Sequence, residues 1–182
     1  MRGKRGHLRV SVDLSSVVAA TTRWLNAAYP ASGGAFDRAL AEAQAQQAVT
    51  VAASLRYPTK VDAALVVLAG PGGSARLDWL AGTEVHDLEH PDHAWRTWVD
   101  EVVASWACCL LADPALAARA VAALPPAPPG VPASSFGRLT EPGRREQNAA
   151  FLLRHPDLQA PVAELHRERL LELIEPDTST AA

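Results

Sequence analysis

Apolar residues recur at three- and four-residue steps along most of the chain, which is the spacing of one face of an α-helix. The strongest such pattern runs from Trp95 to Leu110. It predicts a helix at the centre of the core, because tryptophan side chains bury large apolar areas. The apolar side of this predicted helix consists of Trp95, Trp98, Val99, Val102, Trp106, Cys109 and Leu110.

Weaker patterns predict further helices, and glycine and proline mark where they end. One begins after Asp13 or Ser15 and ends before Pro30, a second covers residues 35–55, and a short one covers residues 75–81. The second is rich in alanine and glutamine, which favours close helix packing within the same chain. Asp113 and Pro114 fit the cap and the first position of another helix that extends to residue 124.

Residues 61–69 are ambiguous, because an apolar run of this length fits either a short helix or a buried strand. A strand followed by the loop Gly70–Ser74 and a helix would resemble the arrangement that binds phosphate at a helix N-terminus. The loop lacks the lysine of a P-loop and the third glycine of a dinucleotide-binding turn. Helix capping glycines and a turn are therefore the favoured interpretation of this loop.

Histidines gather just before the tryptophan-rich helix, at His86, His90 and His93. His86 and His90 are four residues apart, so one helical turn would place both imidazoles on the same side. Imidazoles with a nearby carboxylate form a suitable ligand set for zinc or another divalent metal. Pro91 opposes this arrangement, because a proline disfavours helical geometry at the residue before it. An exposed polar loop is the favoured interpretation, and a metal site is the alternative.

A proline-rich segment provides the clearest boundary in the chain. Residues 125–132 read PPAPPGVP, and the bias toward Gly, Ser and Pro continues to residue 143. Such a segment is extended and semi-rigid, which is typical of a linker. It divides the chain into an expected helical bundle at 10–124, a linker at 125–143 and a helical hairpin at 144–175. Between Arg138 and Glu175 the chain carries six arginines and seven acidic residues, which does not favour DNA binding.

Composition limits the class of protein further. The chain has 182 residues, 48% hydrophobic and 20% charged, with a net charge of -3, which is ordinary for one globular protein and unfavourable for nucleic-acid binding. Cys108 and Cys109 are adjacent and have no third cysteine to pair with, so a reducing, cytoplasmic compartment is expected. The longest apolar run is far shorter than a membrane span.

The sequence thus predicts an all-α protein, an irregular helical bundle followed by a proline-rich linker and a helical hairpin. Since no catalytic motif is found, the leading hypothesis is a non-enzymatic interaction or accessory protein that binds a protein partner or another copy of itself. The hairpin is the expected contact surface. The alternative is a divalent-metal-binding protein or metal-dependent enzyme that uses His86, His90 and His93.

Overall fold

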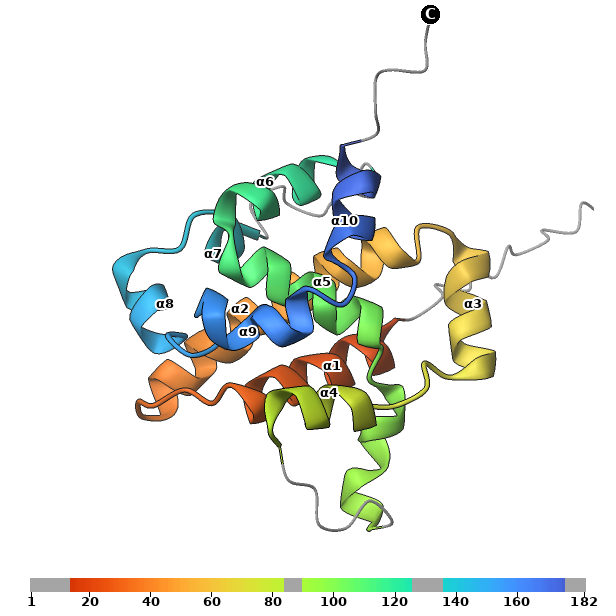
Figure 1. Cartoon of the computed structure of the whole chain (residues 1–182), viewed down its shortest axis with the longest axis horizontal. Helices are drawn as coiled ribbons and strands as arrows, with labels where there is room; N and C mark the ends of the chain where they lie inside the picture. The colour runs from red at the N-terminus through yellow and green to blue at the C-terminus, as the bar shows by residue number, and fades with distance from the viewer. Residues whose placement is uncertain (1–13, 84–89, 126–135, 176–182) are drawn as a thin grey trace, which may run out of the picture.

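Every regular element is a helix in the part of the chain that the computed structural model describes, residues 14–83, 90–125 and 136–175. The all-α class predicted from the hydrophobic pattern is confirmed. The elements in chain order are α1 (Ser15–Ala28), α2 (Ala35–Arg56), α3 (Lys60–Ala69), α4 (Ala75–Ala81), the 3₁₀ helix η1 (Pro91–Trp98), α5 (Glu101–Ala112), α6 (Pro114–Ala122), α7 (Gly137–Thr140), α8 (Arg144–Ala149), α9 (Pro156–Ala163) and α10 (Arg167–Ile174) (Figure 1).

Helix α5 lies at the centre of the molecule, with the other helices arranged around it (Figure 1). All its side chains from Val103 to Leu111 are buried. Its most extensive interface is with α2, and α9 packs against it as well. The α2 residues buried in the core include five alanines, Ala41, Ala45, Ala48, Ala52 and Ala53. Small side chains allow two helix backbones to approach closely, so the close packing predicted for α2 is confirmed.

The helix boundaries follow from capping residues in the sequence. Thr59 caps α3 with a capping box, in which its hydroxyl accepts from the Asp62 N–H while the Asp62 carboxylate accepts from the Thr59 N–H. Asp113 accepts from two backbone N–H groups at the start of α6, and Pro114 occupies the first turn. Gly82 ends α4 in the left-handed conformation that a side chain would disfavour. Residues 61–69 lie within α3, so this run forms a helix and the strand interpretation is wrong.

The predicted continuous helix from Trp95 to Leu110 is also wrong, because the chain breaks at Val99 and Asp100. Both residues are extended, and the Asp100 carboxylate accepts from the Val103 N–H at 3.0 Å, which makes Asp100 the N-cap of α5. The two segments therefore differ in burial. Trp106 in α5 is buried, whereas Trp95 and Trp98 in η1 are half-buried at the edge of the core.

The C-terminal residues form three helices around the core rather than the two that were expected. Helix α8 packs against α2, while α9 and α10 pack against α5. Leu153, Val162 and Leu170 are fully buried in the same hydrophobic core as the side chains of α5. Most of the proline-rich segment lies outside the described residues, so the division into bundle, linker and hairpin stays a prediction.

Two networks of buried and half-buried polar groups join distant helices. In the first, Asp78 accepts from the Trp24 indole at 2.9 Å, from the Ser74 hydroxyl at 2.8 Å and from the Arg96 guanidinium at 3.1 Å. In the second, Arg154 donates to Gln44 Oε1 at 2.6 Å and to carbonyl oxygens at two other positions. A buried charge is tolerated when it is paired and hydrogen-bonded, so these networks fix how the outer helices sit on the core.

Candidate functional site

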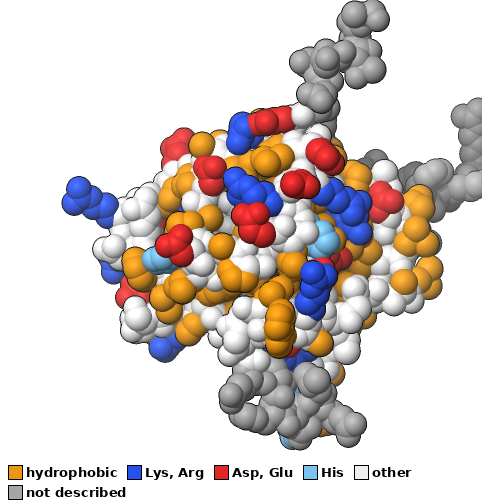
Figure 2. Space-filling model, viewed as in Figure 1, with side chains coloured by type: hydrophobic (Ala, Val, Ile, Leu, Met, Phe, Trp, Pro, Cys, Tyr) orange, Lys and Arg blue, Asp and Glu red, His pale blue; other side chains and the backbone are white. Residues whose placement is uncertain are grey.

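Helix α3 carries an apolar surface that faces away from the rest of the molecule. Val61, Leu65 and Leu68 are 67%, 58% and 83% exposed, and the small side chain of Ala64 lies between them. We refer to these four residues as the α3 stripe. In Figure 1, α3 projects from one side of the molecule, and Figure 2 shows hydrophobic side chains along that edge. Adjacent exposed aliphatic residues on one helix face are unusual for a surface that only meets water.

The orientation of α3 follows from the positions of its two buried side chains. Ala63 and Val66 face the molecule and are 4% and 8% exposed. Successive residues of an α-helix are rotated by about 100°, which places the α3 stripe on the opposite face. The helix therefore presents apolar residues on two faces, and the body of the protein covers one of them.

A cavity lies at the base of α3, where this helix meets the end of α2, Trp106 of α5 and α10. Its volume is ≈ 520 Å³, and its lining includes the apolar side chains of Leu55 and Leu173. The charged residues of the lining are equally divided by sign, with two arginines and two acidic residues: Arg56, Arg169, Asp62 and Glu172. The cavity thus has no dominant charge that would select a small anion or a small cation.

A smaller hollow of ≈ 400 Å³ lies where α3 approaches Tyr57 and Asp100, and Leu65 of the α3 stripe forms part of its lining. The Tyr57 hydroxyl donates a hydrogen bond to the Asp100 carboxylate, which also caps α5. Burial and this bond to a carboxylate raise the pKa of Tyr57 above its ordinary value. The phenol therefore stays protonated, and its role here is to connect the end of α2 with the start of α5.

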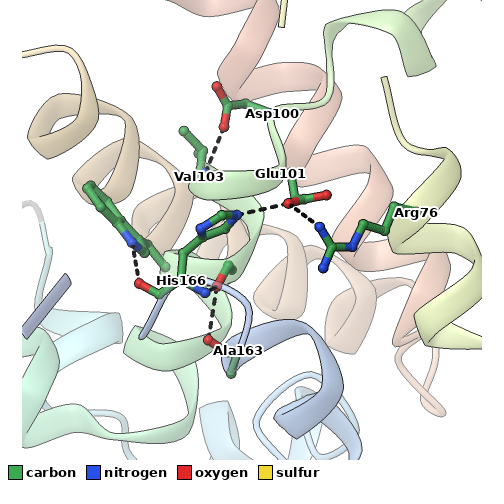
Figure 3. Close-up of polar contacts among 8 residues, drawn as sticks. Arg76, Asp100, Glu101, Val103, Ala163 and His166 are labelled. Atoms are coloured by element: carbon green, nitrogen blue, oxygen red, sulfur yellow. Dashed lines mark hydrogen bonds and ion pairs between the residues drawn. The ribbon is translucent and has the colours of Figure 1, made fainter. Parts of the chain in front are cut away.

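A polar cluster lies at the start of α5, between α4, α5 and the residues that precede α10 (Figure 3). The Glu101 carboxylate is 2.9 Å from Nε2 of His166 and 3.3 Å from the Arg76 guanidinium. The Ser105 hydroxyl donates to the Ala163 carbonyl at 2.9 Å and accepts from the His166 N–H at 3.1 Å. Glu101 and Ser105 belong to α5. Their partners come from elsewhere, with Arg76 in α4, Ala163 at the end of α9 and His166 just before α10.

Serine, histidine and glutamate side chains can together activate a nucleophile when the histidine removes the proton of the serine hydroxyl, but the geometry of this cluster does not allow that step. The serine hydroxyl is buried and bonded to two backbone groups, and the histidine nitrogen that reaches outward is occupied by Glu101. A nucleophile needs its base within hydrogen-bond reach, whereas Ser105 contacts only the backbone of His166. The cluster therefore holds α9 and α10 against α5.

The two cysteines are buried and unpaired in α5. Burial raises the pKa of the Cys108 thiol well above its ordinary value. Burial also raises the pKa of Cys109 to about 11, although Arg167 partly offsets this effect. A thiol is nucleophilic as the thiolate, so both cysteines are suited to packing rather than to chemistry.

The histidines proposed as metal ligands are partly outside the described residues. His86 is among those outside. His90 is exposed at the start of η1, His93 is half-buried, and their ring centroids are 6.2 Å apart. Within the described residues, no third histidine, cysteine or carboxylate joins them in a group that could hold a metal ion. A site that includes His86 stays a prediction.

Sequence patterns did not reveal the α3 stripe or the polar networks. Arg96 lies outside the apolar side of the predicted tryptophan-rich helix, yet it is 7% exposed and bonded to Asp78. Gln44 belongs to the alanine- and glutamine-rich pattern of residues 35–55. Its amide accepts from Arg154 and donates to the Glu146 carbonyl at 3.0 Å.

Known proteins provide no independent guide to function. Comparison of the chain with protein-family models, with curated proteins and with solved structures finds no match in any of the three. Among the described residues, no helix has both the length and the apolar character needed to cross a membrane. A functional proposal therefore rests on the exposed surface of the molecule itself.

Proposed function

We propose that this chain is a non-enzymatic protein-interaction or accessory protein, and that the α3 stripe is its contact surface. The observation that carries the proposal is the exposure of Val61, Leu65 and Leu68 on one continuous helix face. Burial of a valine or leucine side chain contributes about 1.5–3 kcal/mol, so a partner that covers this face gains favourable free energy. Apolar contact of this kind does not require a catalytic group.

The way α3 is held also supports the proposal. Its N-terminus is stabilised by the capping box of Thr59 and Asp62, and its buried face is anchored by Ala63 and Val66. The helix is therefore formed before any partner binds, which reduces the entropy lost on binding. The segment 144–175, where the sequence predicted the contact surface, buries Leu153 and Leu170 in the core, and its exposed leucines, Leu158 and Leu173, are less exposed than Leu68.

A capture experiment tests this proposal. The tagged protein and its variant Leu68→Glu are used to isolate partners from extracts of cells that contain the natural protein. We expect proteins that are retained by the parent chain to be lost with the variant, because a carboxylate within the stripe opposes apolar contact. Phe151→Glu is the matched control, since Phe151 is 60% exposed on a different part of the molecule. Equal retention by all three proteins would contradict the proposal.

The alternative function, metal binding through residues 86–93, is supported by the proximity of the His90 and His93 rings. Elemental analysis of protein purified without a histidine tag tests it. Under this alternative, zinc or another divalent ion is present in stoichiometric amount and is lost in His86→Ala and His90→Ala. Metal content that is absent, or unchanged in both variants, would exclude this site.

A further inference from the structure

We infer that the partner of the α3 stripe is a second copy of this chain, bound so that two α3 helices pack antiparallel about a twofold axis. This inference rests on the proposed function, because it takes the α3 stripe as the contact surface. It adds the identity and the orientation of the partner. Three features of α3 support it: the spacing of the stripe, the charges at the two ends of the helix, and the mixed charge of the surface beside it.

The spacing of the stripe is symmetric about its own centre. Val61 and Leu68 lie at its two ends, about two helical turns apart, and Ala64 and Leu65 lie midway between them. In an antiparallel pair, Val61 of one copy faces Leu68 of the other, and the two middle residues meet at the axis. The small side chain of Ala64 allows the backbones to approach closely there. A twofold interface requires one surface to complement itself in this way.

The charges at the ends of α3 complement each other in the same orientation. Lys60 is exposed at the first residue of the helix, and the last turn contains no basic residue. The end of a helix carries partial negative charge on carbonyl oxygens that lack a partner within the helix. Antiparallel packing places Lys60 of each copy beside the last turn of the other α3. A parallel pair would instead place the two lysines together.

The surface beside the stripe does not favour a partner of strong opposite charge. The neighbouring cavity is lined by two arginines and two acidic residues, Arg56, Arg169, Asp62 and Glu172. A strongly basic or acidic partner would therefore meet repulsion as well as attraction. A copy of the same surface presents both signs and can match them by rotation about the twofold axis.

The size of the stripe indicates how stable the dimer is. A standard interface takes about 800 Å² of surface from each partner. The four side chains of the stripe are partly exposed and include an alanine, so they supply less than this area. We therefore expect a reversible dimer that dissociates on dilution.

Sedimentation measurements over a range of protein concentrations test self-association. The parent chain is expected to change from monomer to dimer as concentration rises from low micromolar to millimolar. Leu65→Glu is expected to remain monomeric, because the twofold axis brings its two carboxylates close together. Phe151→Glu is expected to dimerise like the parent. A parent chain that is monomeric throughout, or a dimer that Leu65→Glu does not weaken, would overturn the inference.

Cross-linking tests the orientation without relying on that variant. Two proteins are prepared, one with Val61→Cys and the other with Leu68→Cys, and the native cysteines do not interfere because both are buried. On mild oxidation, the mixture is expected to form a disulfide between the two different proteins at least tenfold faster than either forms one with itself. Preferential cross-linking of each protein with itself would indicate a parallel pair and overturn the inference.

The two sets of experiments separate the inference from the proposed function. If the chain does not self-associate but Leu68→Glu loses a different captured protein, the second-copy inference fails and the proposed contact surface stands. If neither self-association nor capture depends on α3, both fail.

Discussion

Helices α3 and α5 have similar apolar sequences, KVDAALVVLA and EVVASWACCLLA, but opposite surroundings. From Val103 to Leu111 every side chain of α5 is buried, whereas α3 buries Ala63 and Val66 and leaves its larger aliphatic residues exposed. The difference lies in contacts rather than in composition. Packing against α2 and α9 covers α5, while α3 contacts the body through one face.

The two helices also differ in polar contacts with their neighbours. In α5, Ser105 bonds to the carbonyl of Ala163, the last residue of α9, and Trp106 bonds to the carbonyl of His166, which precedes α10. The capping box of α3 instead joins two residues of its own first turn. Polar contacts thus fix the position of α5 in the fold, and those of α3 stabilise its helical form.

Thiol reactivity is expected to show the largest difference between the two helices. Val67→Cys introduces a thiol at a position of α3 that is 52% exposed, whereas Cys109 is buried in α5. Because burial raises the pKa of Cys109 to about 11, its thiolate fraction at pH 8 is about 10⁻³. We expect the introduced thiol to react with a water-soluble disulfide reagent at least about 100-fold faster than the native cysteines.

Denaturation in urea is the control for this measurement, since all the thiols then react at similar rates. Native cysteines that react as rapidly as the introduced thiol would show that α5 is not buried as described.

Removal of a leucine side chain is expected to have a large effect in α5 and a small one in α3. Leu110 is fully buried and Leu68 is 83% exposed. Leu110→Ala leaves a cavity and should lower the free energy of unfolding by about 3 kcal/mol. Leu68→Ala should change it by less than about 0.5 kcal/mol. Urea denaturation at low protein concentration measures both, and equal losses would contradict the contrast between the helices.

The sequence predicted the helices that end at prolines and glycines but not the break before α5. Helices α2 and α4 lie close to their expected boundaries, because Gly34, Pro58 and Gly82 mark their ends. Val99 and Asp100 contain neither glycine nor proline. The signal there was an aspartate before a run of helix-forming residues, which is typical of an N-cap. The continuous apolar spacing across it concealed the break.

The α3 stripe could not be predicted because the residues of α3 are apolar on both faces. Periodicity identifies a buried face when polar residues occupy the other one. Here Ala63 and Val66 are buried while Leu65 and Leu68 are exposed, and nothing in their chemistry distinguishes the two pairs. The difference depends on where the body of the protein ends, which is a property of the tertiary structure.

Loss of a polar contact between helices is expected to destabilise α5 less than loss of a core leucine. Ser105→Ala leaves the His166 N–H without its partner and leaves the Ala163 carbonyl with only the weaker Cys109 thiol donor at 3.4 Å. An unpaired buried group raises the free energy of the fold, so we expect a loss of about 2 kcal/mol. Thr50→Ala is the matched control, because the Thr50 hydroxyl bonds to the Gln46 carbonyl of its own helix at 2.7 Å. If urea denaturation shows the same loss of unfolding free energy in both variants, the bonds of Ser105 between helices stabilise the fold no more than a bond within one helix.

Capping residues give the smallest expected difference and the sharpest test of how α3 and α5 relate to the whole fold. Asp100→Ala removes the cap of a central helix and should lower the free energy of global unfolding by about 2 kcal/mol, the upper end for a cap. Thr59→Ala removes the cap of α3 and should cost about 1 kcal/mol. Because α3 contacts the body through one face, that loss should be confined to local opening. Hydrogen exchange should therefore accelerate at α3 amides in Thr59→Ala while α5 amides keep their protection. Faster exchange throughout the molecule in Thr59→Ala would show instead that α3 unfolds together with the core.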